Sequence, residues 1–222
     1  MAVSAQTICH LSDLGLIDYD QAYRLQKQAV EDVLADEEER LLLCEHPTVF
    51  TLGRLAKEDH FLIGQDLLKE KGFQIRHIDR GGEVTLHAPG QIVAYPILDL
   101  KRRGSDLRRY LFQLEQIAID FLKGFDIMSE RVEGKTGIWV RTKKIASIGI
   151  GVKKWISFHG LALNINTDLS LFSYIRPCGL DVRMTSMQEI KRCTIEWDEA
   201  KKAFLSALGR QFDLRFKETA DQ

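Results

Sequence analysis

A glycine-rich polar stretch that runs directly into an apolar segment constrains the fold of this chain more than any other feature. Residues 80–91 read RGGEVTLHAPGQ, and residues 92–98 read IVAYPIL. The paired Gly81 and Gly82 permit backbone conformations with positive φ and the close approach of another group. The apolar segment has the composition of a buried strand. A polar loop that leads into a buried strand commonly lines a binding cleft, whereas a hairpin turn with ordinary surface polar residues explains the stretch equally well.

The composition of the chain narrows its class. The 222 residues carry a formal net charge of −1, so nothing attracts the whole chain to nucleic acid or a membrane, and neither is expected as a partner. The apolar runs are too short to span a bilayer, and residues 1–10 lack the pattern of a secretory signal. The four cysteines lie far apart, which favours a reduced, cytoplasmic compartment. Because 45% of the residues are hydrophobic and no linker divides the chain, we expect one domain over residues 1–222.

Hydrophobic periodicity and capping residues predict an alternation of helices and strands. Asp18 or Asp20 can cap a first long helix, Ser105 or Asp106 a second, and Asp198 a last one. Glycines at positions 72, 124 and 209 follow periodic segments, where glycine commonly ends a helix. We expect the first helix to bury Ala22, Tyr23, Leu25, Ala29, Val30, Val33 and Leu34. We expect helices at about 18–35, 66–71, 105–124 and 198–209, and strands at 6–13, 41–44, 49–52, 73–78, 92–98, 137–141, 144–150 and 156–166.

A hairpin predicted from two of these strands gives one lysine an inward position. If Ile148 and Ile150 face the core, strand alternation puts Ala146 and Lys144 on the same face and turns Lys143 the other way. A lysine directed at a protein interior needs a partner or a cleft, because an unpaired buried charge is costly. From these residues alone, the favoured alternative is a strand-end lysine that extends to solvent.

A cysteine and a histidine each have an ordinary structural explanation when taken alone. Cys178 stands between Pro177 and Gly179, which argue for a fixed turn that presents the thiol. An isolated cysteine is nevertheless most often a small buried hydrophobe. His159 precedes Gly160 inside a strand, where a glycine often marks a bulge or a close backbone approach, and a lone histidine there is usually a hydrogen-bonded structural residue.

Two further groups of residues invite a functional interpretation. Cys44 and His46 have the wrong spacing for a zinc pair and lack a matching second pair, so we expect no metal site. The basic run at residues 101–103, with Arg108 and Arg109 nearby, fits a docking patch for an acidic partner. A solvated helix start explains it more simply.

Three segments of the chain form a combined signature. They are Arg80-Gly81-Gly82-x-x-Thr85-x-His87-x-x-Gly90-Gln91, the run Lys144-Ile145-Ala146-Ser147-Ile148-Gly149, and His159-Gly160-Leu161-Ala162-Leu163-Asn164-Ile165-Asn166 followed by Pro177-Cys178-Gly179. Their order and spacing resemble those of the lipoyl(octanoyl) transferases. The resemblance runs from about residue 40 to residue 190. Glu83, Leu86 and Ala88 depart from the residues frequent in that family, which affects the fine shape of an acyl pocket.

The resemblance implies an enzyme that moves an octanoyl group from octanoyl-acyl carrier protein to a lysine of a lipoyl domain, without a cofactor. The acceptors would be 2-oxoacid dehydrogenase E2 subunits and the glycine cleavage H protein. The implied fold is α+β, a mixed β-sheet packed with α-helices like the biotin/lipoate protein ligase catalytic domain, with its core at about residues 35–210. Cys178 would be the nucleophile that carries the acyl thioester, and Lys144 would lower the pKa of that thiol. The acyl site would be lined by Arg80, Gly81, Gly82, Glu83, Val84, Thr85, Leu86, His87, Ser147, Ile148, Gly149, Gly160, Leu161 and Ala162.

Three other activities stay open. An ATP-dependent lipoate or biotin ligase shares the implied fold and needs no cysteine nucleophile. A non-catalytic binder of lipoyl domains is a second alternative, although the presence of both Lys144 and Cys178 argues against it. An acyl-thioester hydrolase is a third, and its product would be a free fatty acid instead of a modified protein.

Overall fold

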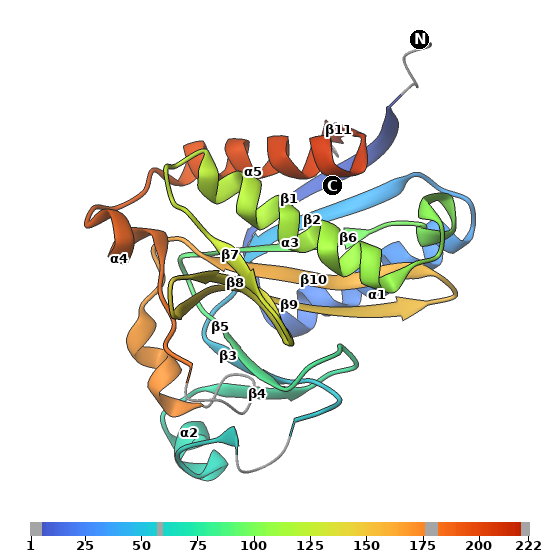
Figure 1. The fold of residues 1–222 in the computed structure, drawn as a ribbon. Coiled ribbons are helices and arrows are strands. Elements are labelled where there is room, and N and C mark those ends of the chain that lie inside the picture. The colour runs from blue at the N-terminus through green and yellow to red at the C-terminus, as the bar shows by residue number, and fades with distance from the viewer. Residues whose placement is uncertain (1–5, 57–59, 176–181, 219–222) are drawn as a thin grey trace.

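The computed structural model describes residues 6–56, 60–175 and 182–218, and a mixed β-sheet lies at their centre (Figure 1). The described residues contribute eight strands to this sheet in the order β11-β1-β2-β6-β10-β9-β8-β7. The pairs β1–β2 and β1–β11 are parallel, and the remaining neighbours are antiparallel. The strands are β1 (Thr7–Leu16), β2 (Glu39–Glu45), β6 (Gln91–Ile97), β7 (Glu130–Val132), β8 (Lys135–Val140), β9 (Lys143–Lys153), β10 (Ile156–Asn164) and β11 (Leu214–Glu218). This sheet, packed with helices, confirms the predicted fold class.

A smaller sheet lies below the main one in Figure 1. Its strands are β3 (Val49–Leu52), β4 (Gln74–His77) and β5 (Val84–His87), in the order β4-β3-β5. It has a core of its own, to which α2 (Gln65–Glu70) and the 3₁₀ helix η3 (Leu169–Tyr174) contribute Leu68 and Phe172. The glycine-rich stretch therefore leaves the small sheet with β5 and enters the main sheet with β6.

Helices cover both faces of the main sheet. Helix α1 (Tyr19–Leu34) packs on one face, and α3 (Leu107–Lys123) and α5 (Trp197–Phe212) pack on the other (Figure 1). Strand β6 lies between these layers and is buried along its whole length. Its side chains alternate, so Val93 and Tyr95 join the α1 cluster while Ile92 and Ala94 join the α3–α5 cluster. Two short helices, η2 (Leu100–Arg103) and α4 (Met187–Lys191), complete the described secondary structure.

The helix boundaries agree with the predicted caps at two of three sites. The Asp18 side chain accepts hydrogen bonds from the first turn of α1, and Asp106 does the same for α3. The predicted boundaries of the last helix are wrong. Helix α5 has Glu196 at its N-cap and Asp198 inside its first turn, and it continues past Gly209 to Phe212. Gly209 is buried within the helix, where a Cβ would meet the carbonyl oxygen of Leu214 at 3.2 Å, so this glycine permits close packing of β11.

The buried face of α1 differs from the predicted one at several positions: Tyr19 is buried although it was not predicted, and Tyr23 and Leu34 are only partly buried. Leu25 is 42% exposed, and Gln26 takes a fully buried position instead. The Gln26 side chain is buried because it accepts a hydrogen bond from a backbone N–H group of β10, described below. Within the described residues, no helix has both the length and the apolar character needed to cross a membrane.

Candidate active site

A cavity of about 360 Å³ lies where the small sheet meets the main sheet. Helix α1, strands β5, β6, β8, β9 and β10, and the loop before β5 all contribute to its walls. The cavity brings together Lys144 and every other predicted site residue in the described part of the chain except Leu86. Leu86 is buried in the core of the small sheet, because alternation along β5 turns it away from Thr85 and His87. Cys178 lies outside the described residues.

The loop at Arg80 is held against β9. The Arg80 guanidinium donates hydrogen bonds to the Thr51 carbonyl oxygen at 2.8 Å and to the Gly81 carbonyl oxygen at 2.9 Å. The Gly81 N–H donates to the Ile150 carbonyl oxygen at 2.9 Å. Gly149 makes this contact possible, because a Cβ there would lie 2.9 Å from Arg80 Cδ and 3.0 Å from the Gly81 carbonyl oxygen. The loop and β9 thus form two adjoining walls of the cavity.

Strand β10 carries a strained residue at the cavity wall. His159 is buried and has a φ of 54°, a left-handed conformation that is uncommon for a residue with a side chain. Its backbone N–H donates to Gln26 Oε1 at 2.8 Å, and its Nε2 lies 2.9 Å from Asp79 Oδ1. At the next position, a Cβ on Gly160 would lie 2.3 Å from the Ala94 carbonyl oxygen. These contacts support the structural interpretation of His159 and the close approach predicted at Gly160.

Asp79 connects the loop, helix α1 and strand β10. Besides His159, it accepts hydrogen bonds from the Tyr23 hydroxyl at 2.8 Å and from Lys27 Nζ at 2.7 Å. These donors, with His159 first, hold the pKa of the Asp79 carboxyl well below its usual range. Burial lowers the pKa of His159. This cluster fixes the position of the residue that immediately precedes Arg80.

Aromatic and imidazole rings close the end of the cavity beside α1. The rings of Tyr19 and His87 stack with centroids 5.9 Å apart. Behind them, His46 Nδ1 lies 2.7 Å from the Ile17 carbonyl oxygen and therefore carries the proton, so His46 Nε2 accepts from the Tyr95 hydroxyl at 2.8 Å. Burial, with nearby His46 and Arg80, lowers the pKa of His87 well below its usual value, so this ring is neutral. The sequence motif contains His87, but Tyr19, His46 and Tyr95 were not predicted as site residues.

A chain of amides sets the tautomer of His87. Asn164 Nδ2 donates to the Thr185 carbonyl oxygen at 3.0 Å, so Asn164 Oδ1 faces Gln91 and accepts from Gln91 Nε2 at 2.9 Å. Gln91 Oε1 then faces His87 Nδ1 at 3.3 Å, which must be the protonated nitrogen. The unprotonated nitrogen of His87 is therefore Nε2. Cys44 Sγ lies 3.5 Å from His46 Nε2 within the same buried region. Among the described residues, no group of three or more His, Cys, Asp or Glu side chains is arranged to hold a metal ion.

Lys144 is a buried lysine on the cavity wall, with only 2% of its surface exposed. Its Nζ donates to the Thr136 carbonyl oxygen at 2.9 Å and lies 5.8 Å from the centre of the Trp139 ring. The inward orientation derived for Lys144 from strand alternation is confirmed, and the alternative favoured from those residues alone, a strand-end lysine that extends to solvent, is wrong. The predicted face is wrong: Ala146 pairs with Ile138, whereas Lys144 pairs with Trp139, one residue further along β8.

A β-bulge explains this difference. Two steps on β9 match a single step on β8, so the alternation changes phase between Lys144 and Ala146. Ala146 faces the α3–α5 core, while Lys144 lies on the opposite face with Ser147. The segment that follows the undescribed residues 176–181 attaches here, because the Lys144 N–H donates to the Arg183 carbonyl oxygen and the Thr185 N–H donates to the Lys144 carbonyl oxygen, both at 2.9 Å.

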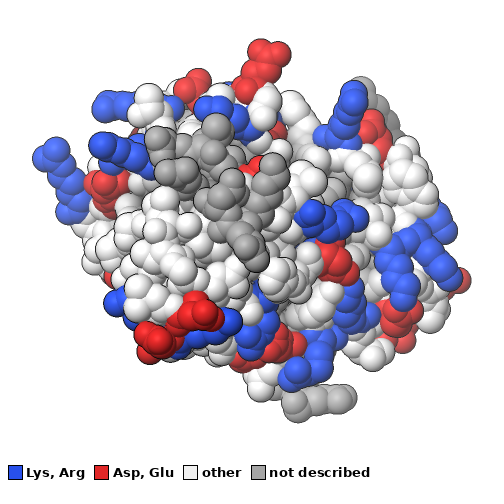
Figure 2. Space-filling model, turned by 90° about the horizontal axis from the view of Figure 1, so that it is seen from below, with Lys and Arg blue, Asp and Glu red and all other residues white. Residues whose placement is uncertain are grey.

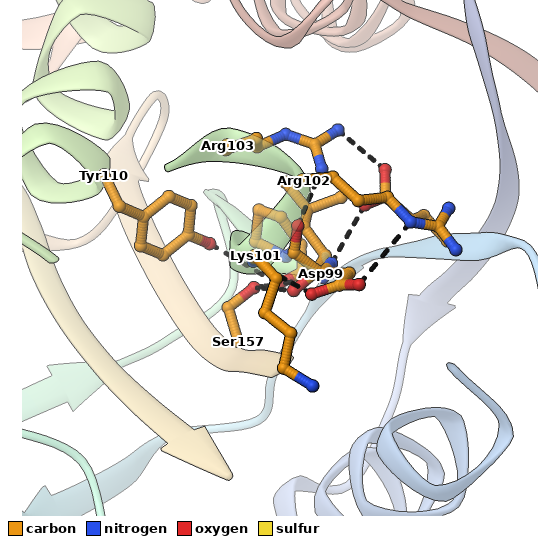
Figure 3. Close-up of polar contacts among 9 residues, drawn as sticks. Asp99, Lys101, Arg102, Arg103, Tyr110 and Ser157 are labelled. Atoms are coloured by element: carbon orange, nitrogen blue, oxygen red, sulfur yellow. Dashed lines mark hydrogen bonds and ion pairs between the residues drawn. The ribbon is translucent and has the colours of Figure 1, made fainter. Parts of the chain in front are cut away.

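The basic run at residues 101–103 is partly structural. Arg103 forms two hydrogen bonds with the fully buried Glu39, at 2.5 Å and 2.7 Å, and Arg102 lies 3.5 Å from Asp99 (Figure 3). In the same view Lys101 extends away from these contacts. On the face shown in Figure 2, Lys and Arg side chains alternate with Asp and Glu around much of the margin. Arg103 is therefore the ion-pair partner of a buried carboxylate and does not belong to a docking patch.

Comparisons with known proteins agree on one family. The model of the family "Lipoyl protein ligase A/B catalytic domain" matches residues 18–209. An octanoyltransferase of Geotalea uraniireducens (strain Rf4) is 44% identical over 172 residues, which cover 77% of this chain and 77% of that protein. An octanoyltransferase of Caldicellulosiruptor saccharolyticus is 40% identical over 214 residues, which cover 95% of this chain and 90% of the relative.

Solved structures with the same fold include two kinds of ligase. A putative lipoate protein ligase from T. acidophilum with bound lipoic acid superimposes with a TM-score of 0.72 at 14% identity, covering 98% of this chain and 90% of that one. The biotin protein ligase from Aquifex aeolicus in complex with biotin and ATP gives a TM-score of 0.59 at 16% identity, covering 91% and 70%. At such identities the likeness shows the shared fold alone.

Proposed function

Because this chain belongs to the octanoyltransferase family and is an acyltransferase of lipoate biosynthesis, we propose that it transfers octanoyl from octanoyl-acyl carrier protein to the ε-amine of a lysine on a lipoyl domain. The acceptors are the lipoyl domains of 2-oxoacid dehydrogenase E2 subunits and the glycine cleavage H protein, in the cytoplasm. The observation that carries the proposal is a buried lysine on the wall of a cavity that is closed at one end by neutral rings.

The first half-reaction is a thioester exchange. Cys178 Sγ attacks the carbonyl carbon of the octanoyl thioester, the carbon–sulfur bond to the carrier breaks, and the carrier thiol leaves. A free cysteine has a pKa of about 8.5, and a neighbouring ammonium lowers it. The Lys144 ammonium would fill this role. The Lys144 N–H is hydrogen-bonded to the carbonyl oxygen of Arg183, which follows Cys178 by five residues. Because five residues of chain span at most about 18 Å, Cys178 is confined to that distance from Arg183.

The octanoyl chain fits the part of the cavity between Lys144 and the closed end. Strand β10 lies between β6, which carries Tyr95, and β9, which carries Lys144. The two outer strands of this trio are therefore about 10 Å apart. Seven carbon–carbon bonds of about 1.5 Å give an extended octanoyl chain about 9 Å long. Burying roughly six methylenes stabilises the acyl-enzyme by about 5 kcal/mol, enough to hold the chain while the protein partners exchange.

The second half-reaction needs a neutral amine. The acceptor lysine attacks the Cys178 thioester, the carbon–sulfur bond breaks, and an amide forms. If the leaving carrier thiolate takes a proton from Lys144, the resulting amine of Lys144 can accept the proton that the acceptor lysine releases. Lys144 suits this role better than His87, because His87 stacks on Tyr19 at the closed end, away from the acyl carbonyl. Backbone N–H groups of the glycine-rich loop are candidates for stabilising the tetrahedral oxyanion.

The test is intact mass spectrometry of the protein mixed with octanoyl-acyl carrier protein in the absence of ATP. We expect a covalent octanoyl adduct on Cys178 that hydroxylamine removes and that a lipoyl domain converts to an octanoyl amide. Lys144→Met should slow adduct formation at least a hundredfold. Its matched control is Lys143→Met, because Lys143 is the adjacent residue and its ammonium binds the exposed Glu189 instead, at 2.8 Å.

Three outcomes separate the alternatives. Transfer that requires ATP and free octanoate identifies a ligase. Tight lipoyl-domain binding that Cys178→Ser leaves unchanged, without any transfer, identifies a binder. Release of free octanoate without acceptor modification identifies a hydrolase.

A further inference from the structure

A peptide group of β8 holds the buried ammonium of Lys144. The Lys144 Nζ donates to the Thr136 carbonyl oxygen at 2.9 Å. The side chain passes beside Gly137, where a Cβ would lie 2.5 Å from Lys144 Cε and 3.1 Å from Nζ. Gly137 is buried and has a φ of 119°, so both the available space and the backbone conformation require glycine. The position of the ammonium therefore depends on the conformation of β8 at these two residues.

A carboxylate on helix α3 binds the other side of the same peptide group. The Thr136 carbonyl and the Gly137 N–H belong to one trans peptide, so the two groups point in opposite directions. The carbonyl oxygen accepts from Lys144, and the N–H donates to Glu115 Oε1 at 3.2 Å. A rotation of this peptide that carried the oxygen away from Lys144 would also break the hydrogen bond to Glu115. Glu115 therefore opposes the motion that would release the ammonium.

Glu115 is itself fixed in place. It lies on α3, which packs against β8, and its side chain is only 13% exposed. Its second oxygen, Oε2, accepts from Arg131 Nε at 2.9 Å, and Arg131 makes two further hydrogen bonds to α3 at 3.0 Å. Because Arg131 offsets the charge of Glu115, the carboxylate acts on Lys144 through the shared peptide group and not by attraction at a distance.

Two other charged side chains lie nearby, and both are exposed. Glu130 pairs with Trp139 across β7 and β8, and the Lys135 ammonium lies 5.3 Å from the centre of the Trp139 ring. Among the described residues, Glu115 is the side chain that accepts from the Gly137 N–H. The orientation of the peptide is therefore assigned to Glu115 and not to these two neighbours.

We propose that Glu115 is a positioning residue for the acyl transfer, and that it keeps the Lys144 ammonium in place by holding the peptide group between Thr136 and Gly137. This inference rests on the proposed function and adds a residue that does not line the cavity. A displacement of about 1 Å in a reacting group can lower a rate about a hundredfold. Loss of the Glu115 oxygen should therefore slow the acylation step and leave the binding of the donor unchanged.

The test compares three variants in single-turnover acylation by octanoyl-acyl carrier protein. Arg131→Met removes the ion pair but keeps the carboxylate on the Gly137 N–H. Glu115→Gln combined with Arg131→Met keeps a neutral oxygen for that N–H and removes the competing donor. Glu115→Met combined with Arg131→Met has a side chain of similar length and no acceptor, and it leaves no charge of the pair behind.

The three variants should separate the hydrogen bond from the ion pair. We expect Arg131→Met and the Gln double variant to keep the maximal acylation rate within roughly threefold of wild type. The Met double variant should lower this rate roughly tenfold or more, while the donor concentration at half-maximal rate changes less than about twofold. A second readout is ¹⁵N NMR of the lysine ammonium groups, in which the Lys144 resonance is assigned by its absence in Lys144→Met. This resonance should be kept in the first two variants and shifted or lost in the Met double variant.

Two results would overturn the inference. One is an equal acylation rate in the Gln and Met double variants, which would make Glu115 a packing residue. The other is a loss in Arg131→Met as large as that in the Met double variant, which would assign the effect to the ion pair.

Two further measurements keep the inference testable if a variant or the reaction fails. Should the Met double variant not fold, amide hydrogen exchange of Gly137 in the unmodified protein decides, because the inference requires a protected N–H. Exchange as fast as at the exposed Gly134 would contradict it. Failure of the proposed function is distinguishable, since the unmodified protein would then form no octanoyl adduct while the ammonium spectra would still report on Glu115.

Discussion

The ion pair between Arg103 and Glu39 permits a quantitative prediction for Arg103→Met. The Glu39 side chain has no exposed surface, and the Arg103 side chain is 14% exposed. Removing the guanidinium leaves the Glu39 carboxylate buried, with a hydrogen bond from the Asp99 N–H at 2.9 Å. Breaking a buried pair in this way costs about 3–5 kcal/mol, and the partial exposure of Arg103 favours the lower value. For a chain of this size, about 3 kcal/mol lowers the melting temperature by about 6–12 °C.

Urea unfolding followed by circular dichroism measures the effect, and two further variants test its cause. Arg102→Met is the matched control. Arg102 is 49% exposed and 3.5 Å from Asp99, so its loss should cost less than about 1 kcal/mol. The double variant Glu39→Met, Arg103→Met should recover most of the lost stability, because no buried charge is left unpaired. The reasoning is refuted if Arg103→Met costs no more than Arg102→Met, or if the double variant is less stable than Arg103→Met.

Three further predictions concern the cavity walls. Gly160→Ala should destabilise the protein by about 3 kcal/mol in the same unfolding assay, since its Cβ would lie 2.3 Å from the Ala94 carbonyl oxygen. The control is Gly64→Ala, which should be near neutral because its Cβ would have no atom within 4 Å. Asp79→Asn should cost about 1 kcal/mol at pH 7, a modest amount because the carboxylate is 45% exposed. The folded pKa of Asp79 is depressed, so the difference from wild type should shrink progressively as the pH falls below about 4. A difference as large at pH 2 as at pH 7 would contradict the assignment. The pKa of His87 is also depressed, so the unfolded chain binds a proton before the folded protein does, and the stability of the fold should decrease as the pH drops below about 6.5. NMR of the ring nitrogens should show no titration of His87 down to pH 6. A normal titration curve would refute the burial of His87 as a neutral ring.

Local signals in the sequence were sufficient to predict most helices and strands that have a strong hydrophobic period or a capping residue. Asp18 and Asp106 cap α1 and α3 as predicted, because an N-cap needs only its own side chain and the following turn. The strand at β11 was not predicted, since three of its five residues, Leu214–Glu218, are charged and the segment becomes a strand by pairing with β1, about two hundred residues earlier. Gly209 was similarly predicted to end a helix. It instead leaves room for the backbone of Leu214 to pack against the helix, a contact that the local sequence does not reveal.

The site shows the same division between local and long-range information. The motif residues Arg80, Gly81 and Gly149 meet at one cavity, as expected from their shared signature. The inward orientation of Lys144 was predicted by simple alternation, which a β-bulge breaks, so the orientation is right and the reason was wrong. Tyr19 and Trp139 line the cavity without any local signal, because an aromatic residue on a helix or strand has the same pattern whether it meets a core or a cavity.

The parallel pairing of β1 with β11 has a consequence for how the protein is made. Thr7 aligns with Leu214, so β1 waits for this partner until about two hundred further residues have been synthesised. At 5–20 residues per second that interval is about 10–40 s. During this time one backbone edge of β1 is open to intermolecular pairing, and a chain that stops before Leu214 keeps that edge permanently. Termination of synthesis before Leu214 would therefore produce aggregates and not a shortened enzyme.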